Sequence, residues 1–431
     1  MNKKQQAVYI YFILLPFIDV ITSLIVRFTD LKISLGMVVK GLTLIFTIIY
    51  TLFFSKAKFR KKSIKYLLMT FIFFVIYIIA KIQIFSLKFL INELIMFVHY
   101  FYFPFMIIGI FNLFNDLKID NKFMQKILIV NSICYAILLL VPFISGTGFN
   151  SYRWNNFFGN NGWFFSANEV GAITVILLSS QLYYLNTDKK YSLVVTFLIL
   201  LSIALIGTKV SFVGMILMTI LIALILIFKK KKTLSLLLII SLMFIGMMSP
   251  TINNLNVSHK NVLSDEIDTR DLRRLDEIIE NKFLLKTIKL AFNGREDFFV
   301  TNYYVYHHSG IVNKFFGIGW TDWDEIDYNY ERKLIEIDYL DVFIHYGIIG
   351  FLVYFLPVIY IIVNFVKNKT KKGILFWYNI IVFLIGVLIS SIAGHVFSAP
   401  AVSIYLVLIL YFAYNVLKGN DSNEKNSDFY R

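Results

Sequence analysis

The sequence contains a single cysteine, Cys134, so the chain can form no internal disulfide. That thiol lies in an apolar run, where a cysteine usually serves packing. Charged residues are scarce, at 16% of the chain, and no repeat of fixed period occurs. The sequence also has no CxxC, HExxH, P-loop or dinucleotide-binding glycine pattern, any of which would indicate a metal, ATP or nicotinamide site. We therefore expect neither a bound metal nor another cofactor.

Hydrophobic residues are abundant instead: they make up 58% of the chain, and 44 residues are Phe. This composition lies far outside that of soluble domains. Crossing about 30 Å of hydrocarbon takes roughly 20 apolar residues, and a backbone in lipid must satisfy its own hydrogen bonds, as a helix does. The runs are too long and uniformly apolar for barrel strands. The sequence predicts an all-α polytopic membrane protein with twelve transmembrane helices, near residues 7–28, 33–55, 63–85, 89–114, 124–144, 167–186, 191–207, 211–228, 233–250, 339–366, 374–395 and 400–417.

Basic residues orient these helices. The first run follows Lys3 and Lys4 like a signal peptide, but it is long and lacks a small-residue cleavage site, so we expect it to stay as an anchor. With the N-terminus in the cytoplasm, one side collects 24 Lys and Arg near the helix ends and the other only five. This bias predicts a multi-pass protein of the cytoplasmic membrane with both termini inside. The net charge of +15 then serves topology and the anionic inner leaflet, and we expect no nucleic-acid partner.

One connection is long and polar. Residues 251–338 hold 11 of the 42 Lys and Arg, and most of the Asp and Glu. This polar island separates the first nine predicted helices (1–250) from the last three (339–418), which a cytoplasmic tail follows (419–431). Residues 262–292 have the pattern of an amphipathic helix, with Leu272, Leu275 and Ile279 on one face. The charge bias places the island, and with it any active site, outside the cell.

Two short segments add cations to the outer face. In residues 146–171, Arg153 is the only cation among aromatic, Asn and Gly residues, and Asn168 opens the next helix. A helix N-terminus favours anions, although a glycine-rich turn with interfacial aromatics explains the same pattern. Lys209 lies in a turn too short to rise far above the bilayer. A desolvated lysine needs an anion or carbonyl partner, unless it reaches the interface by snorkelling.

The island contributes further candidates. Gly294 permits a turn that presents Arg295. Trp320 and Trp323, in a glycine-containing turn, offer flat surfaces for sugars or lie at the membrane interface. His307 and His308 are typical of ordinary surface.

Three acids stand at the mouth of the tenth helix, namely Glu336, Asp338 and Asp341. A carboxylate is expensive against lipid, so each is expected to face a cavity or a cation. Capping of the helix N-terminus accounts for one or two of the three. His395, at the outer end of the eleventh helix, is isolated in the sequence.

The order of these motifs resembles the bacterial O-antigen polymerase and ligase superfamily (Wzy-type), in its capsule-polymerase branch. The resemblance covers residues 150–351 and the helix count, and it rests on ANEVG, GTKVS, GR, FGIG and EIDYLDxxxxYGIIG. It implies a GT-C-like membrane glycosyltransferase that uses undecaprenyl-diphosphate-linked glycans outside the cytoplasmic membrane. By position, Arg153, Lys209 and Arg295 match the family's basic residues, although Lys209 stands where many members have Arg. The family's His-Asn pair is here Glu336 and Ile337, which leaves the identity of the general base open.

The chemistry of such a donor fits these residues. Without a metal, a departing diphosphate needs fixed cations, and we assign this role to Arg153, Lys209 and Arg295. The acceptor hydroxyl needs a base, for which Glu336 is the first choice and Asp338 the second, with inversion of the anomeric centre. The remaining substrate-binding candidates are Asn168, Trp320, Trp323 and Asp341.

The sequence therefore predicts a polysaccharide polymerase that acts on an undecaprenyl-diphosphate-linked oligosaccharide, in contact with membrane lipid. A flippase and a chain-length regulator are the expected protein partners. Two alternatives remain. An O-antigen-type ligase would share the whole donor site. A lipid-linked oligosaccharide flippase would need charges along a path to both faces, whereas the intramembrane charges are few: Asp19, Lys40, Lys81 and Glu93.

Overall fold

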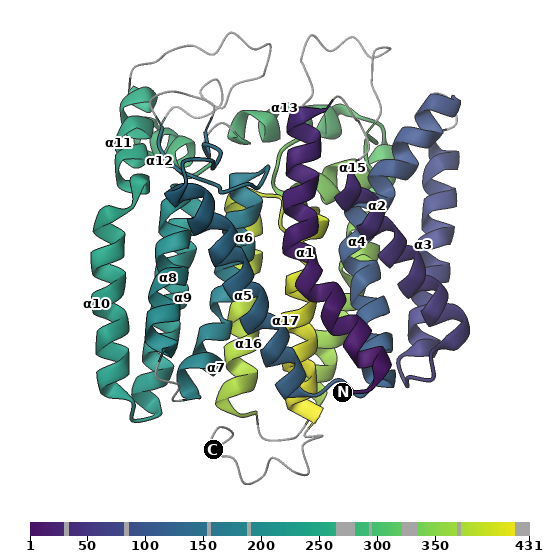
Figure 1. The fold of residues 1–431 in the computed structure, drawn as a ribbon. Helices are drawn as coiled ribbons and strands as arrows, with labels where there is room; N and C mark the ends of the chain where they lie inside the picture. Colours follow the sequence, from purple (N-terminus) through teal and green to yellow (C-terminus); the bar gives the residue numbers. More distant parts are fainter. Residues whose placement is uncertain are drawn as a thin grey trace.

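The computed structural model describes most of the chain, and the described part is helical. It covers residues 1–29, 34–81, 86–152, 157–187, 191–263, 281–292, 295–320, 334–368 and 372–418. The only β-type pairing in these ranges is an isolated antiparallel bridge between Asn150 and Asn160. Successive long helices run up and down through one bundle (Figure 1).

Four of the first five helices begin at polar caps, and the third is the exception. The five helices are α1 (Lys3–Phe28), α2 (Leu35–Ile49), which continues as the π-helix η1 (Tyr50–Phe54), α3 (Arg60–Ala80), α4 (Leu87–Asp116) and α5 (Asn121–Ile144). Asn2, Ser34, Ser86 and Asp120 each accept a hydrogen bond from a backbone amide in the first turn of the helix that follows. Such caps satisfy amides that the helix itself leaves without partners.

The next helices are shorter. They are α6 (Ala167–Leu178), α7 (Ser180–Asn186), α8 (Ser192–Leu205), α9 (Lys209–Phe228) and α10 (Lys232–Met248). The α8–α9 link is only three residues long, and Thr208 caps α9 by accepting the amide of Ser211. The prediction of a tight turn at this point is confirmed, and Lys209 is the first residue of α9.

The polar island is partly helical. It contains α11 (Pro250–Leu263), α12 (Lys282–Phe292), α13 (Arg295–His308) and α14 (Ile311–Phe316). These helices lie at the end of the bundle opposite the start of α1 and the end of α17 (Figure 1). The amphipathic helix predicted for 262–292 coincides with the end of α11 and with α12. Residues 264–280, which carry Leu272, Leu275 and Ile279, lie outside the described residues.

Three helices complete the bundle: α15 (Asp338–Lys367), α16 (Ile374–Ala393) and α17 (Pro400–Lys418). Helix α15 is interrupted at Gly347, where φ is 68°. The interruption leaves carbonyls of the preceding turn without helical partners. The amide of Ile318 donates to the carbonyl of Ile344, and that of Gly319 donates to the carbonyl of His345. Residues 318–319 of the island are thereby hydrogen-bonded to the first turns of α15.

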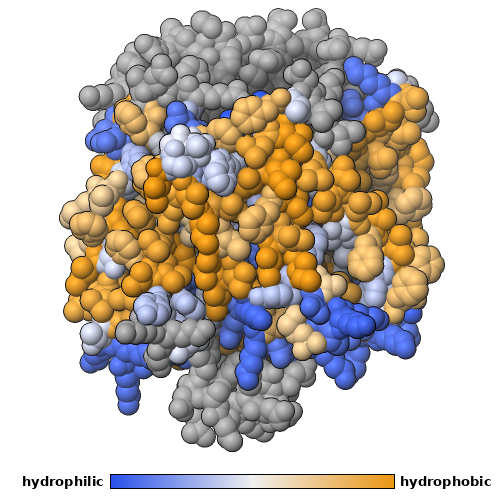
Figure 2. All heavy atoms as spheres, viewed as in Figure 1, coloured by the Kyte–Doolittle hydropathy of each residue, from blue (hydrophilic) through white to orange (hydrophobic). Residues whose placement is uncertain are grey.

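Nine described helices are long and apolar enough to cross a membrane, and ten if α10 and the first half of α11, bent by 48°, form one span. The protein is thus a multi-pass membrane protein, and Figure 2 shows a broad hydrophobic belt with hydrophilic residues along its lower edge and in a few patches along its upper edge. The predicted runs 167–186 and 191–207 correspond to α6–α7 and α8, which fall short of that length. The count of twelve membrane spans is therefore not confirmed.

The four intramembrane charges have local partners. The ammonium group of Lys40 forms an ion pair with Asp19, and Lys81 donates to Asn313 and to the carbonyl of Gly317. Glu93 accepts hydrogen bonds from the Tyr77 hydroxyl at 2.6 Å and the Trp320 amide at 2.7 Å. Charges inside a membrane are tolerated when they are paired in this way.

Candidate functional site

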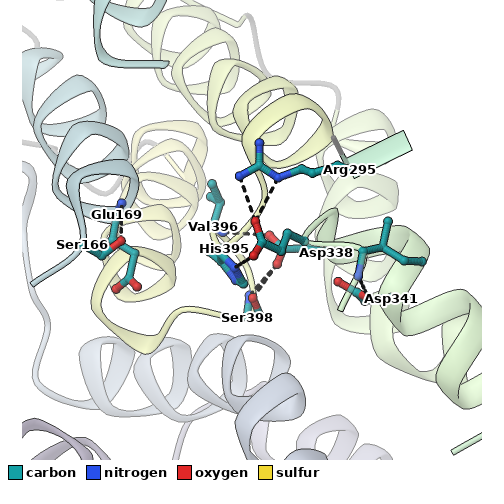
Figure 3. A network of polar contacts seen from close by, with 10 residues as sticks. Ser166, Glu169, Arg295, Asp338, Asp341, His395, Val396 and Ser398 are labelled. Atoms are coloured by element: carbon teal, nitrogen blue, oxygen red, sulfur yellow. Dashed lines mark hydrogen bonds and ion pairs between the residues drawn. The ribbon is translucent and has the colours of Figure 1, made fainter. Parts of the chain in front are cut away.

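A charged cluster lies at the island end of the bundle. Arg295 begins α13, Glu336 lies two residues before the start of α15, and His395 lies in the link between α16 and α17. Figure 3 shows Arg295 and His395 directed toward a common centre above Asp338. Three segments that are distant in the sequence thus build one site.

The guanidinium of Arg295 holds Glu336. Its Nε and one terminal nitrogen donate to the same carboxylate oxygen, Oε2, at 3.1 and 3.0 Å. The Arg295 side chain is 14% exposed and that of Glu336 39% exposed. A charge-assisted contact of this kind is stronger than one between neutral groups. The Glu336 side chain is therefore partly open to solvent, and Arg295 contacts only one of its two oxygens.

His395 approaches that second oxygen. Its Nε2 lies 4.0 Å from Oε1 of Glu336. Burial by itself would raise the pKa of Glu336, but His395 and Arg295 stabilise the carboxylate and hold this pKa below its usual range. Burial lowers the pKa of His395, but the carboxylates of Glu336 and Asp338 outweigh this effect and raise that pKa above its ordinary value. The two groups therefore favour a carboxylate beside an imidazolium.

The backbone at both residues is unusual. Glu336 has φ of 61° and His395 has φ of 53°, both in the left-handed region that non-glycine residues rarely adopt. Gly394 has φ of 62°, and a Cβ at this position would collide with the carbonyl of Glu336. Such strain persists only where the surrounding structure enforces it, and it is concentrated at functional sites.

Asp338 enforces this arrangement. Its Oδ2 accepts hydrogen bonds from the amides of Val396 and Phe397, both at 2.8 Å, and from the Ser390 hydroxyl at 2.9 Å. Its Oδ1 accepts from the amide and the hydroxyl of Ser398. The side chain is completely enclosed. Asp338 thus holds the α16–α17 link in place; its role as second-choice base stays a prediction.

Asp341 is also enclosed. Its Oδ1 accepts the amide of Ile335 at 3.0 Å and lies 3.8 Å from Nε2 of His345. The residue is 1% exposed, so a substrate cannot reach it in this conformation. Asp341 supports the backbone immediately before Glu336, and its contact with substrate stays a prediction.

Trp320 packs instead of presenting a free face. Its ring stacks on Tyr100, at 4.3 Å between centroids, and on His345, at 3.8 Å. Trp320 therefore packs between α4 and α15, and the sugar-platform role stays a prediction. Trp323 lies outside the described residues.

The other predicted residues surround the cluster where they are described. Lys209 is partly buried at the start of α9 and is influenced by the charges of Arg295 and Glu296. Asn168 is partly buried in the first turn of α6, next to Glu169, whose carboxyl interacts with His395. Arg153 lies outside the described residues. The structure thus brings together Arg295, Glu336 and His395, with Lys209 close enough to interact with Arg295.

His395 is the residue that the sequence gave little reason to choose. Its only signal was a histidine at a helix end on the predicted outer face. Nothing in the linear sequence indicated that the α16–α17 link is wrapped around a carboxylate of α15. In the part of the chain that the structure describes, no group of three His, Cys, Asp or Glu side chains is arranged to hold a metal ion.

Comparison with known proteins identifies the family. No curated protein and no solved structure matches the chain. A family model described as "O-antigen ligase like membrane protein" matches residues 1–418, a range that contains every described helix and the whole charged cluster. The chain therefore belongs to the family of O-antigen ligase like membrane proteins.

Proposed function

We propose that this protein is a polysaccharide polymerase. It transfers a glycan from an undecaprenyl-diphosphate-linked donor onto the non-reducing end of a second lipid-linked repeat unit, at the outer face of the cytoplasmic membrane. The observation that carries the proposal is the cluster of Arg295, Glu336 and His395 at the island end of a membrane bundle. Family membership supports a glycosyltransferase-like activity at this site.

The donor diphosphate binds at the cations. Arg295 presents a guanidinium whose two nitrogens already hold an oxyanion at about hydrogen-bonding distance, and diphosphate oxygens accept the same geometry. Lys209 adds a second positive charge nearby, and Arg153 is assigned to the same role from its place in the sequence. Fixed cations stabilise the charge that develops on the leaving diphosphate.

Donor binding also changes the state of Glu336. The diphosphate competes with this carboxylate for the guanidinium of Arg295, because both are oxyanions. When the diphosphate takes the guanidinium, Glu336 is left with His395 as its partner.

The transfer proceeds by direct displacement. The acceptor hydroxyl oxygen forms a bond to the anomeric carbon while the bond from that carbon to the diphosphate oxygen breaks. The electron pair leaves with the diphosphate, and the hydroxyl proton goes to the base side of the cluster. Attack from the face opposite the leaving group inverts the anomeric centre.

Two features bear on membrane orientation. Basic residues gather at the end of the bundle opposite the cluster: Lys62 donates to the Tyr360 hydroxyl and Lys418 to Asn115. Lys58, Lys62, Lys367 and Lys418 line one cavity there. The excess of Lys and Arg on the cytoplasmic side of membrane proteins supports placing this end inside the cell and the site outside.

A ligase is the second candidate, because the family description names that activity. A ligase shares the donor chemistry and differs in its acceptor. A flippase is less well supported, since Asp19, Lys40, Lys81 and Glu93 have local protein partners.

Reconstitution in proteoliposomes tests the proposal. The purified protein receives a synthetic undecaprenyl-diphosphate-linked repeat unit, and products are separated by length. A polymerase gives products longer than one unit from this substrate alone, whereas a ligase transfers glycan only when a different acceptor is added.

The variant Arg295→Gln is expected to abolish transfer, while Lys314→Gln, which removes an exposed cation from the same end of the protein, leaves transfer intact. Normal product ladders from correctly inserted Arg295→Gln protein would contradict the assignment.

A further inference from the structure

We infer that His395 receives the proton of the acceptor hydroxyl, and that Glu336 orients the imidazole and stabilises its protonated form. The inference rests on the proposed function and adds a residue from a separate segment to its site. It also gives Glu336 and His395 separate roles, because the carboxylate that precedes α15 and the imidazole that follows α16 face each other.

The position of His395 is fixed by the three residues that follow it. The amides of Val396, Phe397 and Ser398 all donate to the carboxylate of Asp338. On the other side of His395, Gly394 lies directly against the carbonyl of Glu336. The α16–α17 link therefore has little freedom, and its left-handed turn holds the imidazole beside Glu336. A reacting group needs preorganisation of this kind.

The two oxygens of Glu336 have different roles. Oε2 is held by Arg295 at 3.0 and 3.1 Å, and Oε1 faces Nε2 of His395. A carboxylate is the weaker proton acceptor of the pair, because the ordinary pKa of a glutamic acid is about 4.3 and that of a histidine about 6.5. An imidazole beside a carboxylate is a stronger acceptor, since the positive charge that it gains is stabilised. The carboxylate–imidazole pair of serine hydrolases works by the same logic.

His395 is also reachable. Its side chain is 30% exposed, whereas those of Asp338 and Asp341 are 1% exposed. A hydroxyl entering from the island side can therefore meet the imidazole but neither aspartate.

Charges around the imidazole come from several elements. Glu336 faces it from the segment before α15, Asp338 and Asp341 from α15, Glu169 from α6 and His99 from α4. Glu336 and Asp338 contribute most, and these two carboxylates favour a protonated His395. The raised pKa of His395 agrees with this arrangement.

The proton balance is complete. The neutral imidazole takes the hydroxyl proton while the new bond from the acceptor oxygen to the anomeric carbon forms. The imidazolium beside Glu336 then loses this proton to water once the lipid diphosphate has left. Transfer therefore requires neutral His395, and activity must rise with pH through the pKa of this residue.

The test is the pH dependence of transfer by the full-length protein in proteoliposomes with the synthetic lipid-linked repeat unit. For the wild type, kcat is expected to increase with pH around a midpoint above about 6.5, the ordinary histidine value. His395→Asn retains a residue that tolerates the left-handed backbone and removes the proton acceptor. Its kcat is expected to fall by about 10²–10⁴-fold, the usual contribution of a general base, while the KM for the donor changes little. The fall of kcat at low pH, which the wild type shows, should be absent.

A second variant separates chemistry from folding. His395→Gly fits the backbone without strain and leaves a space for free imidazole, which is expected to restore part of the rate. His307→Asn is the matched control, because His307 is exposed on α13, and it should behave like the wild type.

Three results would overturn the role of His395. The first is that His395→Asn keeps the wild-type kcat and the fall of kcat at low pH. The second is that the midpoint of this fall in the wild type lies in the pH range where carboxylic acids titrate, and the third is that imidazole does not rescue folded His395→Gly. Failure of the proposed function gives a different outcome, in which the wild-type protein transfers no glycan at any pH.

Discussion

Asp338 provides the clearest test of how the site is held together. Its carboxylate is fully enclosed and accepts three backbone amides and two serine hydroxyls. Asp338→Ala leaves the amides of Val396, Phe397 and Ser398 without their acceptor. Each buried donor without a partner costs about 1–3 kcal/mol, so the total loss of stability is expected to be about 3–9 kcal/mol.

Asp338→Asn should be less harmful. It keeps the volume and one acceptor oxygen, but it replaces the other oxygen by an NH2 group that cannot accept the Ser398 amide. The loss of charge and of that contact is expected to cost about 2–4 kcal/mol, since a hydrogen bond to a charged group contributes about 1.5–3 kcal/mol. The expected order of stability is wild type, Asp338→Asn, Asp338→Ala.

Thermal unfolding of the detergent-solubilised protein, followed by size-exclusion chromatography, measures this order. Two neighbouring serines supply a matched pair. Ser390→Ala removes a hydrogen bond to Asp338, whereas Ser391→Ala removes only a bond to the Val387 carbonyl of its own helix. Ser390→Ala is expected to destabilise more. If Asp338→Ala unfolded at the wild-type temperature, the carboxylate would not be what holds the α16–α17 link.

Three further changes follow from the same geometry. Arg295→Lys is expected to lose most transfer activity despite its retained charge, because an ammonium cannot reproduce two parallel N–H donors; wild-type rates in reconstituted vesicles would refute this. Gly394→Ala should prevent stable folding, since the new Cβ would collide with the Glu336 carbonyl. The control Gly146→Ala, at φ of 68° with open space around it, should cost only about 1–2 kcal/mol of backbone strain. Equal melting temperatures of the two variants would contradict this difference. Trp320→Ala is expected to lower the free energy of unfolding by about 3–5 kcal/mol through lost packing, while the KM for the donor, measured on folded protein, changes little. A rise in this KM without a loss of stability would support the sugar-platform role instead.

The apolar helices were largely predictable. The run 124–144 corresponds to α5 (Asn121–Ile144) and the run 400–417 to α17 (Pro400–Lys418). Lipid offers no hydrogen-bond partners, so a long apolar segment has few alternatives to a helix. The interruption of α15 at Gly347 was not predictable, because it depends on the island residues Ile318 and Gly319 supplying amides to the freed carbonyls.

The site was predictable only in part. Arg295 was chosen as a diphosphate ligand and Glu336 as the base, and the structure shows that the two residues form an ion pair, which was not predicted. The roles of Asp338 and Trp320 could not be read in this way. The sequence alone does not distinguish a buried structural carboxylate from a reactive one, or a packed tryptophan from an exposed one.

The sequence by itself determined that the protein is a membrane-embedded helical bundle with a polar segment at one end. Hydropathy decides this, because an apolar run of this length can satisfy its backbone hydrogen bonds in lipid only as a helix. Only the tertiary structure decided which polar groups meet. Arg295, Glu336 and His395 come from three segments that local pattern does not relate, and the buried Asp338 carboxylate, by gathering the amides of the α16–α17 link, brings the third of them to the other two.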